Sequence, residues 1–243
     1  MRSIRAWLAL ALLATFPLAA GAQPILQPPA DVTPQPPRHS LGIDFTISQP
    51  VGEFDRFVNE GYGVDGHYLL RLDRRGIFGL RAQLGAVMYG RESNRACLST
   101  TIGCRILVDV STTNNILSGG FGPQVQLPSG PVRPYLAATA GFSYFFTRSS
   151  VEGTYDNESF ASTTNQDDGT FAWTGSGGVK IPLGSGRQSV MLDLGARYNG
   201  NGRVTYLRKG GIQDLPNGDI MIDPIRSKAD LVTWHIGLVV GLR

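Results

Sequence analysis

Nine ionisable side chains that could do chemistry together recur at alternate positions of the chain, each facing away from the apolar residues around it. If the segments that carry them close into a ring, Asp44, His67 and His235 would converge as the acid–base part of a hydrolase. A hydrolase also needs an activated nucleophile and an oxyanion donor, and the neighbouring Thr46 and Thr233 are poor nucleophiles. We therefore expect no enzyme activity and no cofactor. The nine residues are interpreted as a polar network inside the protein: Asp44, Asp65, His67, Arg71, Arg81, Lys180, Asp193, Arg197 and His235.

The charges of this set are nearly balanced. Because an isolated buried charge is costly, we expect the acids and bases to pair with one another across the interior.

Two cysteines, Cys97 and Cys104, are the only ones in the chain. Both fall in one polar connection, and in an oxidising compartment this spacing favours a disulfide within that connection. Free thiols and a metal site are the alternatives, but no histidine lies nearby to complete a metal site. The acidic pair at 167–168 matches no standard calcium loop, so we expect solvated charge there and no bound metal.

Apolar residues alternate with small or polar ones in eight segments, the clearest of which spans residues 132–146. A period of two is typical of a β-strand with one apolar face. A tilted strand needs roughly 9–11 residues to cross a bilayer. The predicted strands are residues 41–48, 62–72, 78–88, 117–127, 132–146, 171–181, 190–199 and 232–242.

The connections between these strands alternate in length. Turns of a few residues, at 73–76, 128–131 and 184–186, alternate with long polar connections at 91–113, 148–169 and 200–229. An even number of strands places both ends of the domain on the short-turn side. We therefore predict an all-β, eight-stranded, antiparallel up-and-down transmembrane β-barrel, which leaves no unpaired edge in lipid.

The N-terminus predicts export. A basic head with Arg2 and Arg5, an apolar run and the small residues at 20–22 are typical of a signal peptide over 1–22, cleaved before Gln23. A proline-rich tether over 23–38 would precede the barrel domain over 39–243. The formal charge of +3 falls to +1 without those two arginines, and we therefore expect no nucleic-acid partner.

Two stretches resemble the small outer-membrane β-barrel family of Gram-negative bacteria, of the outer-membrane protein A and X type. They are residues 133–136 with 140–142, and residues 192–198. The resemblance covers about residue 40 to the C-terminus and implies an integral outer-membrane barrel. Members of the family commonly end in an aromatic residue that the barrel-assembly machinery reads. This chain instead has Leu242 followed by Arg243.

The function that follows is structural or adhesive, exercised by four long extracellular loops above a lumen closed by the polar network. The expected partners are outer-membrane lipids and lipopolysaccharide, the barrel-assembly machinery, and a host or cell-surface ligand of the loops. Three alternatives stay open: a small channel, a soluble lipocalin-type barrel with its apolar face inward, and a lipid-modifying barrel enzyme. The His-x-Ser pattern of the lipid A deacylase barrels is absent from the sequence.

Overall fold

The computed structural model describes residues 37–97, 107–153, 159–184, 190–215 and 219–242. The predicted signal peptide, nearly all of the predicted tether, and Cys104 lie outside the described residues. Among the described residues, no helix is long and apolar enough to cross a membrane.

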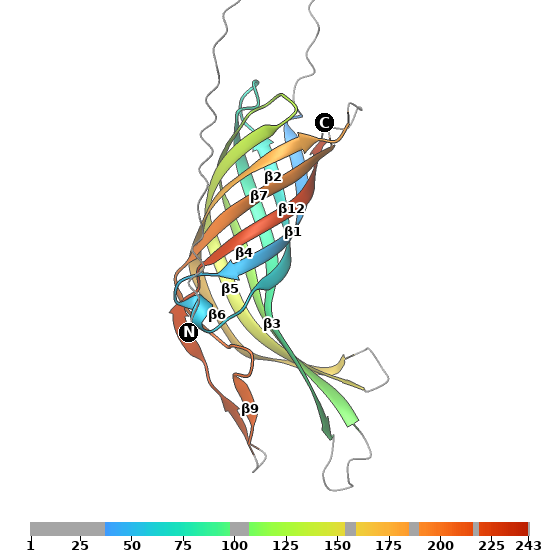
Figure 1. Ribbon diagram of the computed structural model, residues 1–243, viewed down its shortest axis with the longest axis vertical. Helices are drawn as coiled ribbons and strands as arrows, with labels where there is room; N and C mark the ends of the chain where they lie inside the picture. The colour runs from blue at the N-terminus through green and yellow to red at the C-terminus, as the bar shows by residue number, and fades with distance from the viewer. Residues whose placement is uncertain (1–36, 98–106, 154–158, 185–189, 216–218, 243) are drawn as a thin grey trace, which may run out of the picture. The chain divides into compact units, whose positions relative to one another are not determined.

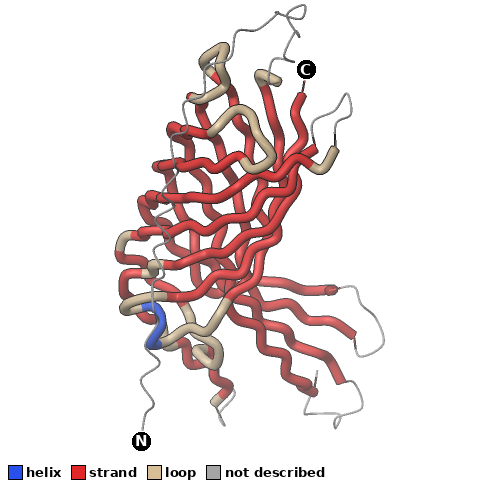
Figure 2. The backbone as a smooth tube through the Cα atoms, turned by 45° about the horizontal axis from the view of Figure 1, so that its top comes forward, coloured by secondary structure: helices blue, strands red, loops and turns tan. Residues whose placement is uncertain are grey.

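Eight long antiparallel strands close into a barrel in the order β1-β12-β7-β6-β5-β4-β3-β2 (Figures 1 and 2). Closure is made by β12 pairing with β1, so the two ends of the barrel sequence lie together, with His39 opposite Leu242. The eight strands are β1 (His39–Pro50), β2 (Gly61–Arg71), β3 (Phe78–Cys97), β4 (Leu107–Gln126), β5 (Arg133–Gly153), β6 (Ser159–Pro182), β7 (Val190–Asn201) and β12 (Leu231–Leu242).

The apolar face of each strand points outward and the polar face points into the barrel. In β1 every second residue is buried, and the exposed ones include Ile43 at 66% and Phe45 at 49%. Large apolar side chains on the other strands are equally exposed, such as Phe121 at 68% and Leu136 at 66%. Such a surface needs an apolar solvent around it. This orientation excludes the lipocalin-type alternative, in which the apolar face would line the interior.

Two glycines with positive φ help to form the short turns between strands. Gly76 has a φ of 75° in the turn between β2 and β3, and Gly130 has a φ of 106° in the turn between β4 and β5. A residue with a Cβ would be strained in this left-handed region. In the first turn, the Asp73 carboxylate also accepts a hydrogen bond from the backbone N–H of Phe78 over 2.8 Å.

The long connections predicted at 91–113 and 148–169 contain much more strand than expected. β3, β4, β5 and β6 continue past the barrel as one four-stranded sheet, visible at the lower right of Figure 1. The polar Ser, Thr and Asn residues there lack the apolar alternation of a half-buried strand. Pairing with neighbouring strands on both sides nevertheless keeps the central strands extended.

The last long connection, predicted at 200–229, forms two nested, two-stranded ladders at the same end of the barrel. One pairs β8 (Arg203–Tyr206) with β11 (Ile225–Lys228), and the other pairs β9 (Ile212–Asp214) with β10 (Ile220–Ile222). A single 3₁₀ turn, η1 (Phe54–Arg56), lies in the connection between β1 and β2.

Candidate functional site in the barrel lumen

All nine side chains predicted to form the polar network lie in the barrel interior. None is more than 8% exposed, and Asp193 is fully buried. They project from six strands, so ring closure is what brings them together. The strands supply Asp44 (β1); Asp65, His67 and Arg71 (β2); Arg81 (β3); Lys180 (β6); Asp193 and Arg197 (β7); and His235 (β12).

Five of the large polar side chains in the lumen lie over a glycine on a neighbouring strand. The glycine is in each case the residue directly opposite in the ladder, and a Cβ on it would collide with the polar side chain. The interior of an eight-stranded barrel is narrow, so a glycine, which has no side chain, makes room for the large polar side chain opposite it. The pairs are His67 over Gly42, Asp44 over Gly237, Asp65 over Gly85, His235 over Gly195 and Tyr135 over Gly178.

Acidic and imidazole groups alternate across the centre of the lumen. The Nδ1 atom of His67 lies 2.9 Å from Asp44 Oδ2, and its Nε2 atom lies 3.8 Å from Asp193 Oδ2. On the other side of Asp193, Oδ1 lies 3.8 Å from Nε2 of His235, which is itself 2.9 Å from the Tyr135 hydroxyl. The proposed convergence of Asp44, His67 and His235 is therefore real for the first two, whereas His235 faces Asp193 and Tyr135.

Pairing between lumen acids and bases is sparser than the sequence suggested. Among the described lumen residues, the only Arg or Lys within ion-pair distance of a carboxylate is Arg197, whose Nη1 lies 2.8 Å from Asp65 Oδ2. Arg81 and Lys180 instead contact neutral groups, because the strand register places glutamine amides and the Tyr135 ring beside them. Arg81 donates to the side-chain oxygens of Gln83 and Gln124, each over 3.3 Å.

Two further cations follow the same pattern. Arg71 donates to the backbone oxygen of Pro37. Lys180 Nζ lies 4.8 Å from the ring centroid of Tyr135, whose electron-rich face attracts a cation. A cation can be buried beside such dipoles and π faces without a carboxylate in contact.

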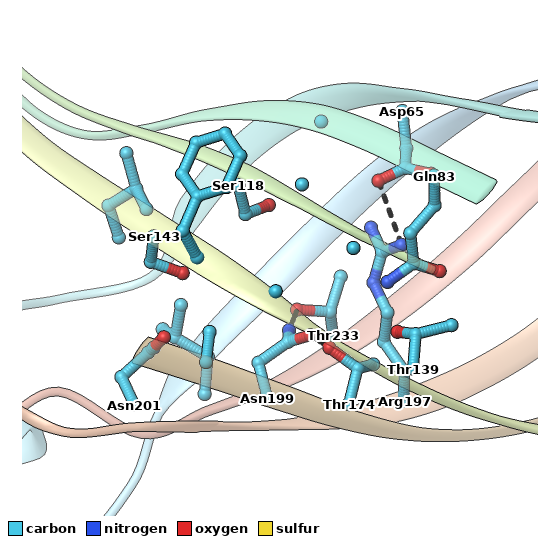
Figure 3. A pocket seen from close by; sticks show the side chains of 18 of the residues that line it. Asp65, Gln83, Ser118, Thr139, Ser143, Thr174, Arg197, Asn199, Asn201 and Thr233 are labelled. Atoms are coloured by element: carbon cyan, nitrogen blue, oxygen red, sulfur yellow. Dashed lines mark hydrogen bonds and ion pairs between the residues drawn. The ribbon is translucent and has the colours of Figure 1, made fainter. Parts of the chain in front are cut away.

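A small cavity of about 20 Å³ lies beside Arg197 in the lumen, lined by polar side chains and by apolar ones such as Val87 and Leu231 (Figure 3). Short hydroxyl and amide side chains line it and bond to one another. Thr174 donates to Asn199 Oδ1, and Asn199 donates to Thr233 Oγ1, each over 3.0 Å. A volume of this size holds about one water molecule, so it does not form a continuous aqueous path.

An aromatic plug fills the loop end of the lumen. Phe54 from η1 is fully buried and packs edge-to-face against Tyr206 from β8 and Tyr89 from β3, with ring centroids 4.9 and 5.7 Å away, and against Phe145 from β5 at 6.1 Å. Burial raises the pKa of Tyr206, whose hydroxyl lies 2.9 Å from Ser227 Oγ. The sequence signal for this plug was weak, since Phe145 shares the inward face of β5 with one other large aromatic, Tyr135, among small and polar residues.

The predicted disulfide stays a prediction. Cys97 is the last residue of β3, and its expected partner Cys104 lies outside the described residues. Among the described residues, no serine, threonine or cysteine is hydrogen-bonded to the imidazole of His67 or His235. The centre of the lumen therefore has an acid–histidine pair but no positioned nucleophile in the part of the chain that is described.

No protein-family model and no curated protein matches this chain. Solved structures that are similar over most of the chain include Neisserial surface protein A, at 15% identity over 84% of this chain and 97% of that one, with a TM-score of 0.39. The attachment invasion locus protein Ail of Yersinia pestis matches at 12% identity over 84% and 98%, with a TM-score of 0.40. A major outer membrane protein from Thermus thermophilus matches at 14% identity over 83% and 98%, with a TM-score of 0.41. The chain itself folds as a closed eight-stranded antiparallel barrel, the architecture implied by its resemblance to the outer-membrane protein A and X type.

Proposed function

We propose that this protein is an integral outer-membrane β-barrel that acts at the cell surface without catalysis, by binding a ligand through its protruding sheet. The membrane assignment is supported by the apolar outer face of the barrel strands and by their closure into a ring. Its membrane partners are outer-membrane lipids and lipopolysaccharide, and the barrel-assembly machinery inserts it. The ligand is a host or cell-surface molecule that meets the long loops.

The observation that carries the surface role is the extension of four strands beyond the barrel. Pairing of β3 with β4 continues to Cys97 opposite Leu107, and pairing of β5 with β6 continues to Glu152 opposite Ser159. The outer neighbours stop earlier: β2 leaves β3 at Met88, and β7 leaves β6 at Ala172. Residues 91–97 of β3 and 159–166 of β6 therefore form sheet edges with no neighbouring strand in the described chain.

The two edges differ in charge. The β3 edge carries Arg91, Glu92 and Arg95, and charged side chains are a common device that prevents strand addition. The β6 edge over 159–166 reads Ser-Phe-Ala-Ser-Thr-Thr-Asn-Gln and carries no charge. An unpaired, uncharged edge of this kind accepts an extended segment of another protein as an added strand. We therefore place the ligand contact on the β6 edge.

The first experiment tests whether this sheet is outside the cell. Single cysteines at Thr163, on the β6 edge, and at Ser129, in a short turn, would be placed in a Cys97→Ser, Cys104→Ser background. On intact cells, a membrane-impermeant maleimide should label the first cysteine and not the second. Labelling of Ser129→Cys alone would invert the orientation and remove the β6 edge from the cell surface.

The second experiment tests the edge itself. Bacteria that express the protein should adhere to host-cell monolayers more than the vector control, and Thr163→Lys should abolish the difference, because a lysine on an edge blocks strand addition. Thr112→Lys is the matched control, since Thr112 lies in the same row of the sheet but on β4, with strands on both sides. Equal loss in both variants would indicate recognition of the sheet face, and no adhesion above the vector control would contradict the adhesive role.

A further inference from the structure

The outer wall of the barrel is hollowed over β1, β2 and β3. A groove of about 640 Å³ lies there, and its exposed lining is almost entirely apolar. Three outward positions in it carry little or no side chain, namely Gly66 on β2 and Ala82 and Ala86 on β3. A Cβ on Gly66 would meet no atom closer than 3.9 Å, so this position is open. The volume lies in the range of sites that bind a small ligand.

Larger apolar side chains border the groove on both sides. In the ladders, Gly66 lies directly between Ile43 of β1 and Leu84 of β3. Ile43 is 66% exposed and Leu84 is 56% exposed, so both project from the wall. Two such ridges with a glycine between them hold an extended alkyl chain better than a flat wall does, because the chain gains contacts on three sides.

The short-turn end of these three strands is basic. Arg74 and Arg75 are exposed in the turn between β2 and β3, and Arg38 is exposed immediately before β1. The backbone oxygen of Arg38 accepts a hydrogen bond from the N–H of Arg71, which places Arg38 beside the end of β2. In the described part of the chain, Asp73 is the one acidic residue in the turns of this end. A ligand that meets this end should therefore be negatively charged.

The spacing between the basic turn and the groove matches the depth of one lipid leaflet. Tyr68, at the near end of the groove, is four residues from Leu72 at the start of the turn, and Val64, at the far end, is eight residues from it. With a rise of about 3.3 Å per residue and a typical strand tilt of about 40°, they lie roughly 10 and 20 Å below the turn. A leaflet with its headgroup region is roughly 20 Å deep. A lipid whose headgroup is at the turn thus places an acyl chain along the groove.

A polar pair lies between the turn and the groove. The Tyr68 hydroxyl lies 2.6 Å from Nδ1 of His39, and His39 is opposite Leu70 in the ladder, nearer to the turn than the groove is. An aromatic ring with a polar edge suits the boundary between headgroups and hydrocarbon. The order from the turn inward is therefore cationic, polar and apolar, which is the order of groups along a phospholipid.

We infer that this surface binds one molecule of phosphatidylglycerol, with its phosphate at Arg74 and Arg75 and an acyl chain in the groove. The planar guanidinium group of arginine pairs with phosphate through two parallel hydrogen bonds. A second copy of the chain is disfavoured as the occupant, because a two-fold contact through this wall would bring the basic turns of both copies to the same side of the membrane. The inference rests on the membrane placement proposed above and not on the adhesive role.

The test is native mass spectrometry of the folded protein, released from detergent after incubation with phosphatidylglycerol or with phosphatidylcholine of the same acyl chains. We expect one phosphatidylglycerol per chain, bound about tenfold more tightly than phosphatidylcholine, which has no net charge. The double variant Arg74→Gln, Arg75→Gln should lose this preference, because each cation beside an anionic headgroup contributes about a factor of five.

The matched control for charge is the double variant Arg56→Gln, Arg133→Gln, which loses the same charge. Arg56 is exposed at the opposite end of the barrel, and Arg133 begins β5, where its Nη1 contacts Met191. This control should keep the preference for phosphatidylglycerol.

The groove is tested separately from the charge. Gly66→Leu fills the groove and should weaken phosphatidylglycerol binding about tenfold. Gly175→Leu is the matched control, because Gly175 is an open outer-face position of β6, where the nearest atom to a Cβ is in the Trp173 ring at 3.9 Å. It should bind as the unmodified protein does. Heat-modifiable migration on a gel shows that each variant is folded.

If a variant does not fold, the unmodified protein decides: phosphatidylglycerol must raise its unfolding temperature in detergent more than phosphatidylcholine does. Equal retention of the two lipids, or unchanged binding in Gly66→Leu, overturns the lipid site. A dimer that Gly66→Leu dissociates would assign the groove to a second copy and also overturn it. Failure to insert into vesicles of either lipid would refute the membrane placement itself, whereas insertion without a lipid preference refutes this site alone.

Discussion

Gly237→Ala is the most informative single perturbation of the barrel wall. Gly237 on β12 lies directly opposite Asp44 on β1. A Cβ there would overlap Asp44 Oδ1 and the backbone oxygen of Ile43, and would lie 2.7 Å from the Asp44 Cα. A side-chain oxygen can rotate away, but the backbone atoms can move only if the two strands separate. The substitution therefore strains the ladder that closes the barrel.

The expected magnitude follows from two contributions. Overpacking of this kind costs about 1–3 kcal/mol of the free energy of unfolding. If Asp44 also moves away from His67, the lost hydrogen bond to a charged group adds roughly 1.5–3 kcal/mol. The matched control is Gly66→Ala on the outer face, where the nearest atoms to a Cβ are backbone oxygens at 3.9 Å. For Gly66→Ala we expect the free energy of unfolding to rise by about 0.4–1 kcal/mol, because alanine reduces the conformational freedom of the unfolded chain.

The assay is urea-induced unfolding in lipid vesicles, followed by tryptophan fluorescence. Trp173 and Trp234 are both on the outer face, 51% and 56% exposed, so their emission reports loss of the lipid contact. The unfolding midpoint should fall clearly for Gly237→Ala relative to Gly66→Ala. Equal midpoints, or a higher midpoint for Gly237→Ala, would refute the close packing of inward glycines against polar side chains.

Three other outcomes follow from the same structure. Unboiled protein should migrate differently from boiled protein on a gel, because a closed ladder of hydrogen bonds resists detergent; identical migration would contradict closure. The unmodified protein should show no steady ion conductance in planar bilayers. Arg197→Ala should raise the leak current and lower the free energy of unfolding by about 3–5 kcal/mol, because it leaves Asp65 unpaired. Leu194→Ala, on the outer face, should not raise the leak current. Above the apolar belt, the backbone N–H of Thr205 donates to Asp168 over 2.7 Å and lowers its carboxyl pKa. This contact stabilises the loop above the ordinary aspartate pKa and is lost as the pH falls through the lowered value, so Asp168→Asn should speed amide exchange at Thr205 at neutral pH.

The sequence by itself determined the number of barrel strands, the orientation of each of them and the polar side chains of the lumen. These features depend on a period of two, which is a local property of an extended chain. For this reason the alternation alone identifies the nine inward polar residues, from Asp44 to His235, and all nine are buried. The short turns were equally local, since Gly76 and Gly130 adopt backbone angles that other residues avoid.

Only the tertiary structure decided which inward residue meets which. Contacts across the lumen depend on the register of each ladder and on the closure of β12 against β1, and both join residues far apart in sequence. Register sets five of the large polar side chains opposite a glycine, and closure places Asp193 between two histidines where a salt bridge was expected. The aromatic plug and the protruding sheet were also missed, because Phe54 lies in a connection and β3 to β6 extend through polar sequence. In both cases the stabilising partner is a distant segment, and the local pattern of residues carries no information about it.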